Sequence, residues 1–355
     1  MQPRNFAAHA IQSLDLASKR LREHGMLNDH AVLQGLKAQM AGGVNFMLPD
    51  NGRVFDTGYR GLQDADLRLP FPSVTLEYAV PEKHGLVREG RLAYSPKRVI
   101  VAVEVTTDAK SLSWLPERVA NNVRRALVSQ GGEDAQGILV SAISAITDPN
   151  CPSEYVFMPE MAGWVLPAKY PEEVELARMR QEALKEQSVT SISGEIREEG
   201  GVILGRVVLL LEELCISGSA GMPKEKFEQM VDGLSRDIGQ EAGAVLEFIE
   251  ACSCSNVHHQ VVQQAPKAAV AQRRARDGKL PILETRALVL DLPGKESSGM
   301  AGANGDSGRA SPRQHLRRGH IRRLESGKRV WVQSAVVGGE RAGVIDKAYV
   351  IRPRG

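Results

Sequence analysis

Five arginines and two histidines gather within a short stretch near the C-terminus. The group consists of Arg313, His315, Arg317, Arg318, His320, Arg322 and Arg323. A guanidinium group carries a fixed fork of N–H donors that matches phosphate oxygens, and an imidazole can also bond phosphate. A metal-dependent nuclease would also need carboxylates, and residues 308–355 contain only Glu325, Glu340 and Asp346. The spacing therefore favours contact with a polyanion over catalysis in this segment.

Further basic residues extend the candidate binding surface. Arg273 to Lys279 and Arg322 to Lys328 share the pattern Arg-Arg-x-x-(Asp/Ser)-Gly-Lys, which predicts two basic turns with glycine at a positive φ. Trp331 and Tyr349 are candidates for stacking on bases. The predicted nucleic-acid-binding residues are Arg313, Arg317, Arg318, His320, Arg322, Arg323, Lys328, Arg329, Trp331, Arg273, Arg274 and Lys279.

Charge is distributed unevenly along the chain. Residues 308–355 contain twelve Lys or Arg against three Asp or Glu and carry a net charge of +9, whereas the first 307 residues contain 33 against 40 and sum to −7. Such asymmetry indicates a module that binds a polyanionic partner, most often nucleic acid. Two alternatives stay open. The basic face is only a solvated surface, or it docks on an acidic protein, including the body of this chain.

Two carboxylates form a possible metal site in the first half of the chain. Glu77 and Glu104 lie on predicted strands that are candidate neighbours, and paired carboxylates on a sheet can hold the metal ion of a nuclease. The common nuclease pattern would place a lysine two residues after the second acid, where this chain has Thr106. A metal-dependent nuclease is therefore the third functional hypothesis.

A second possible metal site combines thiols and imidazoles. Cys252, Cys254, His258 and His259 follow the pattern C-x-C-x3-H-H. This spacing differs from the C-x2-C knuckle of zinc sites, and no second pair lies near it in the sequence. We predict no metal ion, no cofactor and no catalytic residue.

Composition is that of an ordinary soluble globular protein. Hydrophobic residues make up 42% of the 355 residues and charged residues 25%, and the length is sufficient for two or three domains. Apolar runs are far shorter than a membrane span, and the N-terminus lacks an apolar signal segment. We therefore expect a cytoplasmic protein with no membrane partner and with reduced cysteines.

The first 168 residues are expected to form an α+β domain. Helical periodicity predicts helices over residues 5–24, 30–40 and 116–129. Segments rich in β-branched and aromatic residues predict strands of one sheet, over residues 74–78, 99–105, 137–143 and 155–165. This mixture of helices and strands indicates the α+β class.

Residues 169–293 are expected to form a helical subdomain with a closing strand. The predicted elements are a charged helix from Pro171, a buried helix over 204–216, helices from Pro223 and over 237–252, and a strand over 282–290. Residues 294–311 are rich in Gly and Ser and predict a flexible linker with a reach of about 20–25 Å.

Residues 312–355 are expected to form a small basic module of antiparallel strands. Alternation over 316–324, a turn at Ser326-Gly327 and a return over 328–332 predict a two-stranded ribbon that displays arginines. Shorter strands are expected at 336–337, 344–345 and 349–351. A β-ribbon is a known reader of nucleic-acid grooves.

Two segments together resemble a family of uncharacterised proteins encoded by tailed bacteriophages and prophages. They are PKAAVAQRRARDGKLPILETRALVL (266–290) and SPRQHLRRGHIRRLESGKRVWVQSAVVG (311–338). In that family a similar Arg-rich stretch precedes a strand, and a Gly-rich linker leads to a Ser-Pro-Arg-x-His-x-Arg-Arg-Gly-His motif. The resemblance covers the chain from residue 266 onward and implies a phage origin and the cytoplasm of a bacterial host. It brings no established activity.

These observations give three functional hypotheses. The first is a phage-encoded, non-enzymatic protein that associates with DNA or RNA, whose body is a scaffold or a self-association surface for a homo-oligomer. The second is a host-takeover or structural protein whose basic module docks on an acidic protein partner. The third is the nuclease with carboxylates in residues 1–168.

Overall fold

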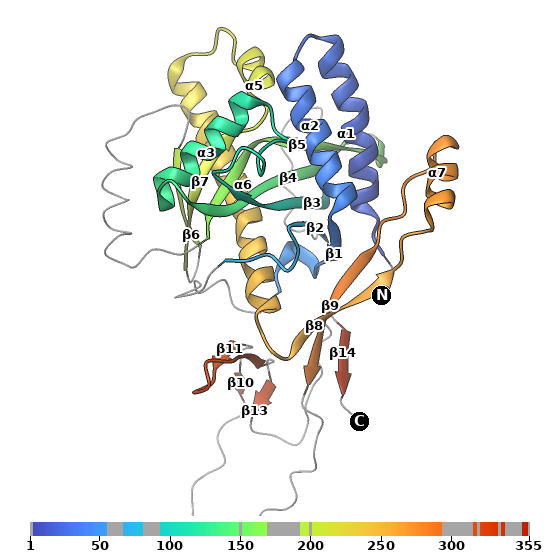
Figure 1. Ribbon diagram of the computed structural model, residues 1–355, viewed down its shortest axis with the longest axis vertical. Coiled ribbons are helices and arrows are strands. Elements are labelled where there is room, and N and C mark those ends of the chain that lie inside the picture. Colours follow the sequence, from blue (N-terminus) through green and yellow to red (C-terminus); the bar gives the residue numbers. More distant parts are fainter. Residues whose placement is uncertain are drawn as a thin grey trace, which may run out of the picture.

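The computed structural model describes residues 3–54, 67–80, 93–148, 151–168, 192–198, 201–292, 315–317, 320–332, 335–337 and 350–353. In this part of the chain, a large mixed sheet lies between helices, and two small antiparallel strand pairs lie near the C-terminus (Figure 1). This arrangement confirms the predicted α+β class. The helix expected from Pro171 and the linker expected over 294–311 lie outside the described residues.

The large sheet combines strands from most of the chain. They are β1 (Val44–Met47), β2 (Ser73–Ala79), β3 (Ala93–Thr106), β4 (Gln136–Asp148), β5 (Cys151–Pro167), β6 (Ile192–Glu198), β7 (Gly201–Leu209), β8 (Val257–Gln263), β9 (Thr285–Leu292) and β14 (Val350–Pro353). Their order is β14-β9-β1-β2-β3-β4-β5-β7-β6, and β8 pairs with β9. The pairings β1–β2, β1–β9 and β14–β9 are parallel, and the other pairings described in this sheet are antiparallel.

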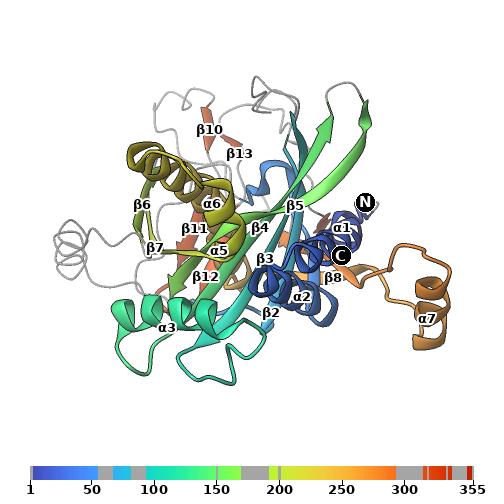
Figure 2. The same ribbon diagram turned by 90° about the horizontal axis from the view of Figure 1, so that it is seen from above.

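Helices cover both faces of this sheet. They are α1 (Phe6–Glu23), α2 (Leu27–Gly42), α3 (Glu117–Gly131), α5 (Glu212–Gly218), α6 (Lys224–Cys252) and α7 (Ala268–Arg276), with a short 3-10 helix η1 (Asp50–Gly52). Figure 2 shows α1, α2 and α3 on one side of the strands and α6 on the other. The residues of β3 alternate accordingly. Val99 and Val101 belong to the core on the α1–α3 side, whereas Ile100 and Ala102 belong to the core on the α6 side.

Most elements predicted in the first 168 residues are confirmed. The three helices correspond to α1, α2 and α3, and the four strands correspond to β2, β3, β4 and β5. On α3, the predicted apolar face of Val119, Val123 and Leu127 is fully buried. The helix begins directly after Pro116, whose fixed φ suits a helix start.

The helix predicted over residues 204–216 is wrong. This segment forms the end of β7 and then the short helix α5. Its apolar run contains no alternation because both faces of β7 are buried: Val207 packs on the α6 side and Val208 on the α1–α3 side. The helices predicted from Pro223 and over 237–252 are one continuous helix, α6.

The large sheet also crosses the boundary expected at residue 168. The strands β7 and β9, from the segment 169–293, pair with β5 and β1 from the first 168 residues. These two segments therefore share one sheet and its two cores.

The C-terminal segment divides between the small strand pairs and the large sheet. The predicted ribbon is confirmed as an antiparallel hairpin of β11 (His320–Arg323) and β12 (Arg329–Val332), with Gly327 at a φ of 77° in the turn. A second antiparallel pair joins β10 (His315–Arg317) and β13 (Ala335–Val337). By contrast, β14 lies parallel to β9 in the large sheet, where Val350 and Ile351 pair with apolar residues of β9.

Candidate nucleic-acid interface

Two basic segments lie at opposite ends of the antiparallel ribbon formed by β8 and β9 (Figure 1). At one end, α7 connects the two strands. At the other end, the turn that precedes β8 holds the β11–β12 hairpin, because the backbone N–H of Ser255 donates to the carbonyl oxygen of Arg329 at 2.9 Å. The seven residues of β8 span about 20 Å. One ribbon therefore fixes the spacing of the two basic segments.

The helix α7 was not predicted, although its basic residues were. Alanine and arginine are strong helix formers, and the helix ends in a Schellman motif. In that motif Gly278 has a φ of 66°, as predicted for this turn, and the N–H of Lys279 donates to the carbonyl of Arg274 at 2.9 Å. None of the residues of α7 is buried, and Figures 1 and 2 show it standing away from the sheet.

The segment around α7, residues 264–281, is strongly basic. It contains five Lys or Arg against one Asp, a net charge of +4. Arg274 is half-buried and donates to the carbonyl oxygen of Leu280 at 3.0 Å, and Lys279 pairs with Asp277 at 3.4 Å. Arg273 and Arg276 are exposed, and neither forms an ion pair within the described part of the chain. They are the side chains best placed here to contact phosphates.

The β11–β12 hairpin packs on the body of the protein, which corrects one predicted role. Trp331 was expected to stack on bases, but it is only 5% exposed and belongs to the core on the α6 side, with Ile321 packed beside it. The side chain of Asn256 bonds both backbone groups of Trp331, at 2.8 and 2.9 Å. In this arrangement the indole holds the hairpin in place and cannot stack on a base.

The basic side chains of the hairpin differ in their accessibility. Arg322 and Lys328 are exposed, and Arg329 is half-buried with its Nη1 donating to Ser253 Oγ at 3.4 Å. Burial raises the pKa of the nearby Glu250 carboxyl to about 7, against the opposing attraction of Arg329. Arg329 therefore contacts the body, whereas Arg322 and Lys328 remain open to a partner.

Several other predicted residues can be placed only in part. Arg317, His320 and Arg323 lie on β10 and β11, which fixes their backbone but not their side chains. Arg313, Arg318 and Tyr349 lie outside the described residues.

Sequence reasoning missed an aromatic and guanidinium cluster on the ribbon. The His259 ring lies 5.6 Å from the Phe71 ring, and the Arg286 guanidinium lies 4.9 Å over the same Phe71 ring. Arg286 Nη1 bonds His259 Nδ1 at 3.1 Å, and Glu284 holds Arg286 at 2.7 Å. The signal for this cluster is the cross-strand pairing of β8 with β9, which requires the strand register and cannot be read from the separated sequence positions.

Glu77 and Glu104 do not form the carboxylate pair of a nuclease. They lie on neighbouring strands, but Glu77 is opposite Val99, and Glu104 lies further along β3, about 17 Å away. Glu77 is fully buried, and its Oε2 accepts the N–H of Ala7 at 3.0 Å in the first turn of α1. Burial raises the pKa of its carboxyl. Glu77 therefore caps a helix.

The Cys and His pattern is also not assembled as a metal site. Cys252 ends α6, and burial raises the pKa of the thiols of Cys252 and Cys254 to about 12, so they carry no thiolate charge at neutral pH. His258 and His259 are consecutive residues of β8 and so point to opposite faces. Within the described ranges, no group of three or more His, Cys, Asp or Glu side chains is placed to hold a metal ion.

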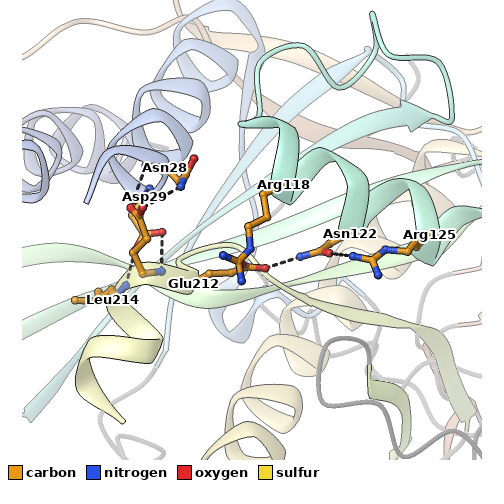
Figure 3. Close-up of polar contacts among 8 residues, drawn as sticks. Asn28, Asp29, Arg118, Asn122, Arg125, Glu212 and Leu214 are labelled. Carbon is orange, nitrogen blue, oxygen red and sulfur yellow. Dashed lines mark hydrogen bonds and ion pairs between the residues drawn. The ribbon is translucent and has the colours of Figure 1, made fainter. Parts of the chain in front are cut away.

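A polar cluster joins α2, α3 and α5 (Figure 3). The Asp29 carboxylate accepts the N–H groups of Glu213 and Leu214, at 3.2 and 2.7 Å, at the start of α5. In return, the Glu213 carboxylate accepts the N–H groups of Asn28 and Asp29, at 3.0 and 3.2 Å, at the start of α2. Glu212 extends the cluster to side chains of α3. The acids cap helices reciprocally, so we assign the cluster a structural role.

Comparisons of this chain with protein-family models, with curated proteins and with solved structures found no match. The resemblance to phage proteins therefore stays a prediction. Among the helices that the structure describes, none combines the length and apolar character needed to span a membrane.

Proposed function

We propose that this is a phage-encoded, non-enzymatic protein that associates with nucleic acid through basic segments at the two ends of the β8–β9 ribbon. The observation that carries the proposal is α7, a helix that buries no residue and lies in a segment of net charge +4. A helix that contributes nothing to a core is available to a surface partner, and its charge favours phosphates.

The hairpin supplies the second contact. Its attachment to the body uses the buried Trp331 and backbone hydrogen bonds, so the exposed Arg322 and Lys328 are not consumed by it. A polynucleotide that follows the ribbon would meet α7 at one end and these side chains at the other. The phage origin rests on the sequence resemblance alone.

The packing of the hairpin on its own body also favours one form of the second hypothesis, in which the basic module docks on protein. The contact between Arg329 and the Glu250 region is of that kind. It uses one basic residue of the hairpin, however, and leaves α7 without a role. Nucleic-acid association accounts for both basic segments.

The test is a fluorescence-anisotropy titration of the intact protein with labelled single-stranded DNA, duplex DNA and RNA at low and moderate salt. The variant Arg273→Gln/Arg276→Gln removes two exposed charges from α7. The matched control, Arg20→Gln/Arg22→Gln, removes two exposed charges from the end of α1. Truncation before residue 308 is a poor substitute because it would remove Trp331 from the core.

We expect the intact protein and the α1 control to bind equally, and the α7 variant to bind more weakly. Binding should also weaken steeply with salt, because phosphate contacts release counterions. Absence of binding to all three probes at low salt would refute the proposal and would direct attention to a protein partner.

A further inference from the structure

We propose that Phe71, His259 and Arg286 form a stacking platform for the bases of a single-stranded polynucleotide. This inference rests on the proposed function and specifies its ligand: a single strand, whose bases are free to stack, in preference to a duplex. The platform replaces Trp331, whose indole is buried.

The three side chains share one face of the sheet. On β9, Arg286 has the same parity as Leu288 and Leu290, which both belong to the core on the α6 side. On β8, His259 lies 5.7 Å from the ring of Phe46, a residue of the same core. The β11–β12 hairpin packs against this core as well, through Trp331. The platform and the hairpin therefore lie on the same side of the sheet.

The platform also lies between the two basic segments. His259 is near the middle of β8, so the α7 end and the hairpin end of the ribbon are each about 10–15 Å away along the strand. Proteins that bind single strands without sequence preference combine basic surfaces that track phosphates with aromatic side chains on which bases stack. Histidine, phenylalanine and arginine planes all serve as such surfaces.

The chemical state of the platform suits stacking. Arg286 can only donate, so His259 Nδ1 accepts its hydrogen bond and the imidazole proton is on Nε2. Burial, followed by the charge of Arg286, lowers the pKa of His259. The imidazole is therefore neutral at physiological pH and can lie against a base without repelling Arg286.

Closure of the core alone does not explain these residues. A position that only seals a core is filled best by a buried apolar side chain. His259 is instead exposed, and Phe71 is half-buried at the edge of the core with a guanidinium over its ring. The cluster thus presents aromatic surface to solvent between two basic segments.

The experiment compares the affinity of the intact protein for a labelled oligothymidylate and for an abasic oligomer with the same number of phosphates. Oligouridylate is a further probe that separates RNA from DNA. Each stacked base should strengthen binding by about 5- to 150-fold, so the abasic oligomer should bind more weakly by at least that factor. An oligothymidylate containing 2-aminopurine should also lose fluorescence on binding, and this readout needs no variant.

The variants His259→Ala and Phe71→Leu should lose the preference for the oligomer with bases while keeping affinity for the abasic one. His258→Ala, a change at the neighbouring residue on the opposite face of β8, should keep the preference. Equal binding of both oligomers by the intact protein would overturn the platform and leave the proposed function standing. Binding of neither oligomer would overturn both.

Discussion

Replacement of Glu250 by glutamine should stabilise the protein at alkaline pH and have little effect at acidic pH. Glu250 lies in the last turns of α6, where it is buried beside Glu247 and where the helix dipole also disfavours a negative charge. Burial raises the pKa of its carboxyl from an ordinary value of 4.5 to about 7. The folded protein therefore binds a proton at this site that the unfolded chain releases.

The sign and size of the effect follow from this difference. A carboxyl whose pKa is raised in the folded state contributes full stability below about pH 4.5, and that contribution is lost as pH rises through about 7. The difference between the two pKa values corresponds to about 3 kcal/mol. Residual water contact and the lost attraction to Arg329 reduce the gain, so we expect Glu250→Gln to add about 1–3 kcal/mol at about pH 8.

Urea unfolding of both proteins at about pH 5 and about pH 8 measures this gain. The control is Glu23→Gln, which changes an exposed carboxylate at the end of α1 and should leave the pH dependence unchanged. If wild type and Glu250→Gln lose stability in parallel between the two pH values, Glu250 is not a buried titrating group and the reasoning fails.

Two further substitutions test the packing. A Cβ at residue 205 would overlap the indole ring of the fully buried Trp164, so Gly205→Ala should lower the free energy of unfolding by about 1–3 kcal/mol or more, whereas Gly218→Ala, with open space around it, should be nearly neutral in the same urea titration. Glu77→Ala leaves the N–H of Ala7 without its acceptor and should lower the free energy of unfolding by about 1–3 kcal/mol; an unchanged thermal midpoint would contradict the helix-capping role.

The sequence predicted those elements whose apolar residues follow a clear period. The faces of α1 and α3 and the strands β2 to β5 could be read in this way, as could the turn at Gly327, which requires a positive φ. The segment over 204–216 could not, because a run buried on both faces has no period and fits a helix equally well.

The candidate site was predictable in charge but not in geometry. The basic residues of 273–279 and 322–329 were found, because charge is visible in composition. The burial of Trp331, the distance between Glu77 and Glu104, and the meeting of Phe71 with His259 depend on strand register and on contacts between distant segments. Local patterns contain no information on these contacts.

The measurement that tests the central claim most directly is the salt dependence of single-strand affinity for the intact protein and for Arg273→Gln/Arg276→Gln. Each phosphate contact on a single strand contributes about −0.7 to the slope of log K against log salt concentration. If both arginines of α7 contact phosphates, the variant slope should be shallower by about 1.4, and the Arg20→Gln/Arg22→Gln control should keep the slope of the intact protein. An α7 variant with an unchanged slope would contradict the claim that α7 binds nucleic acid.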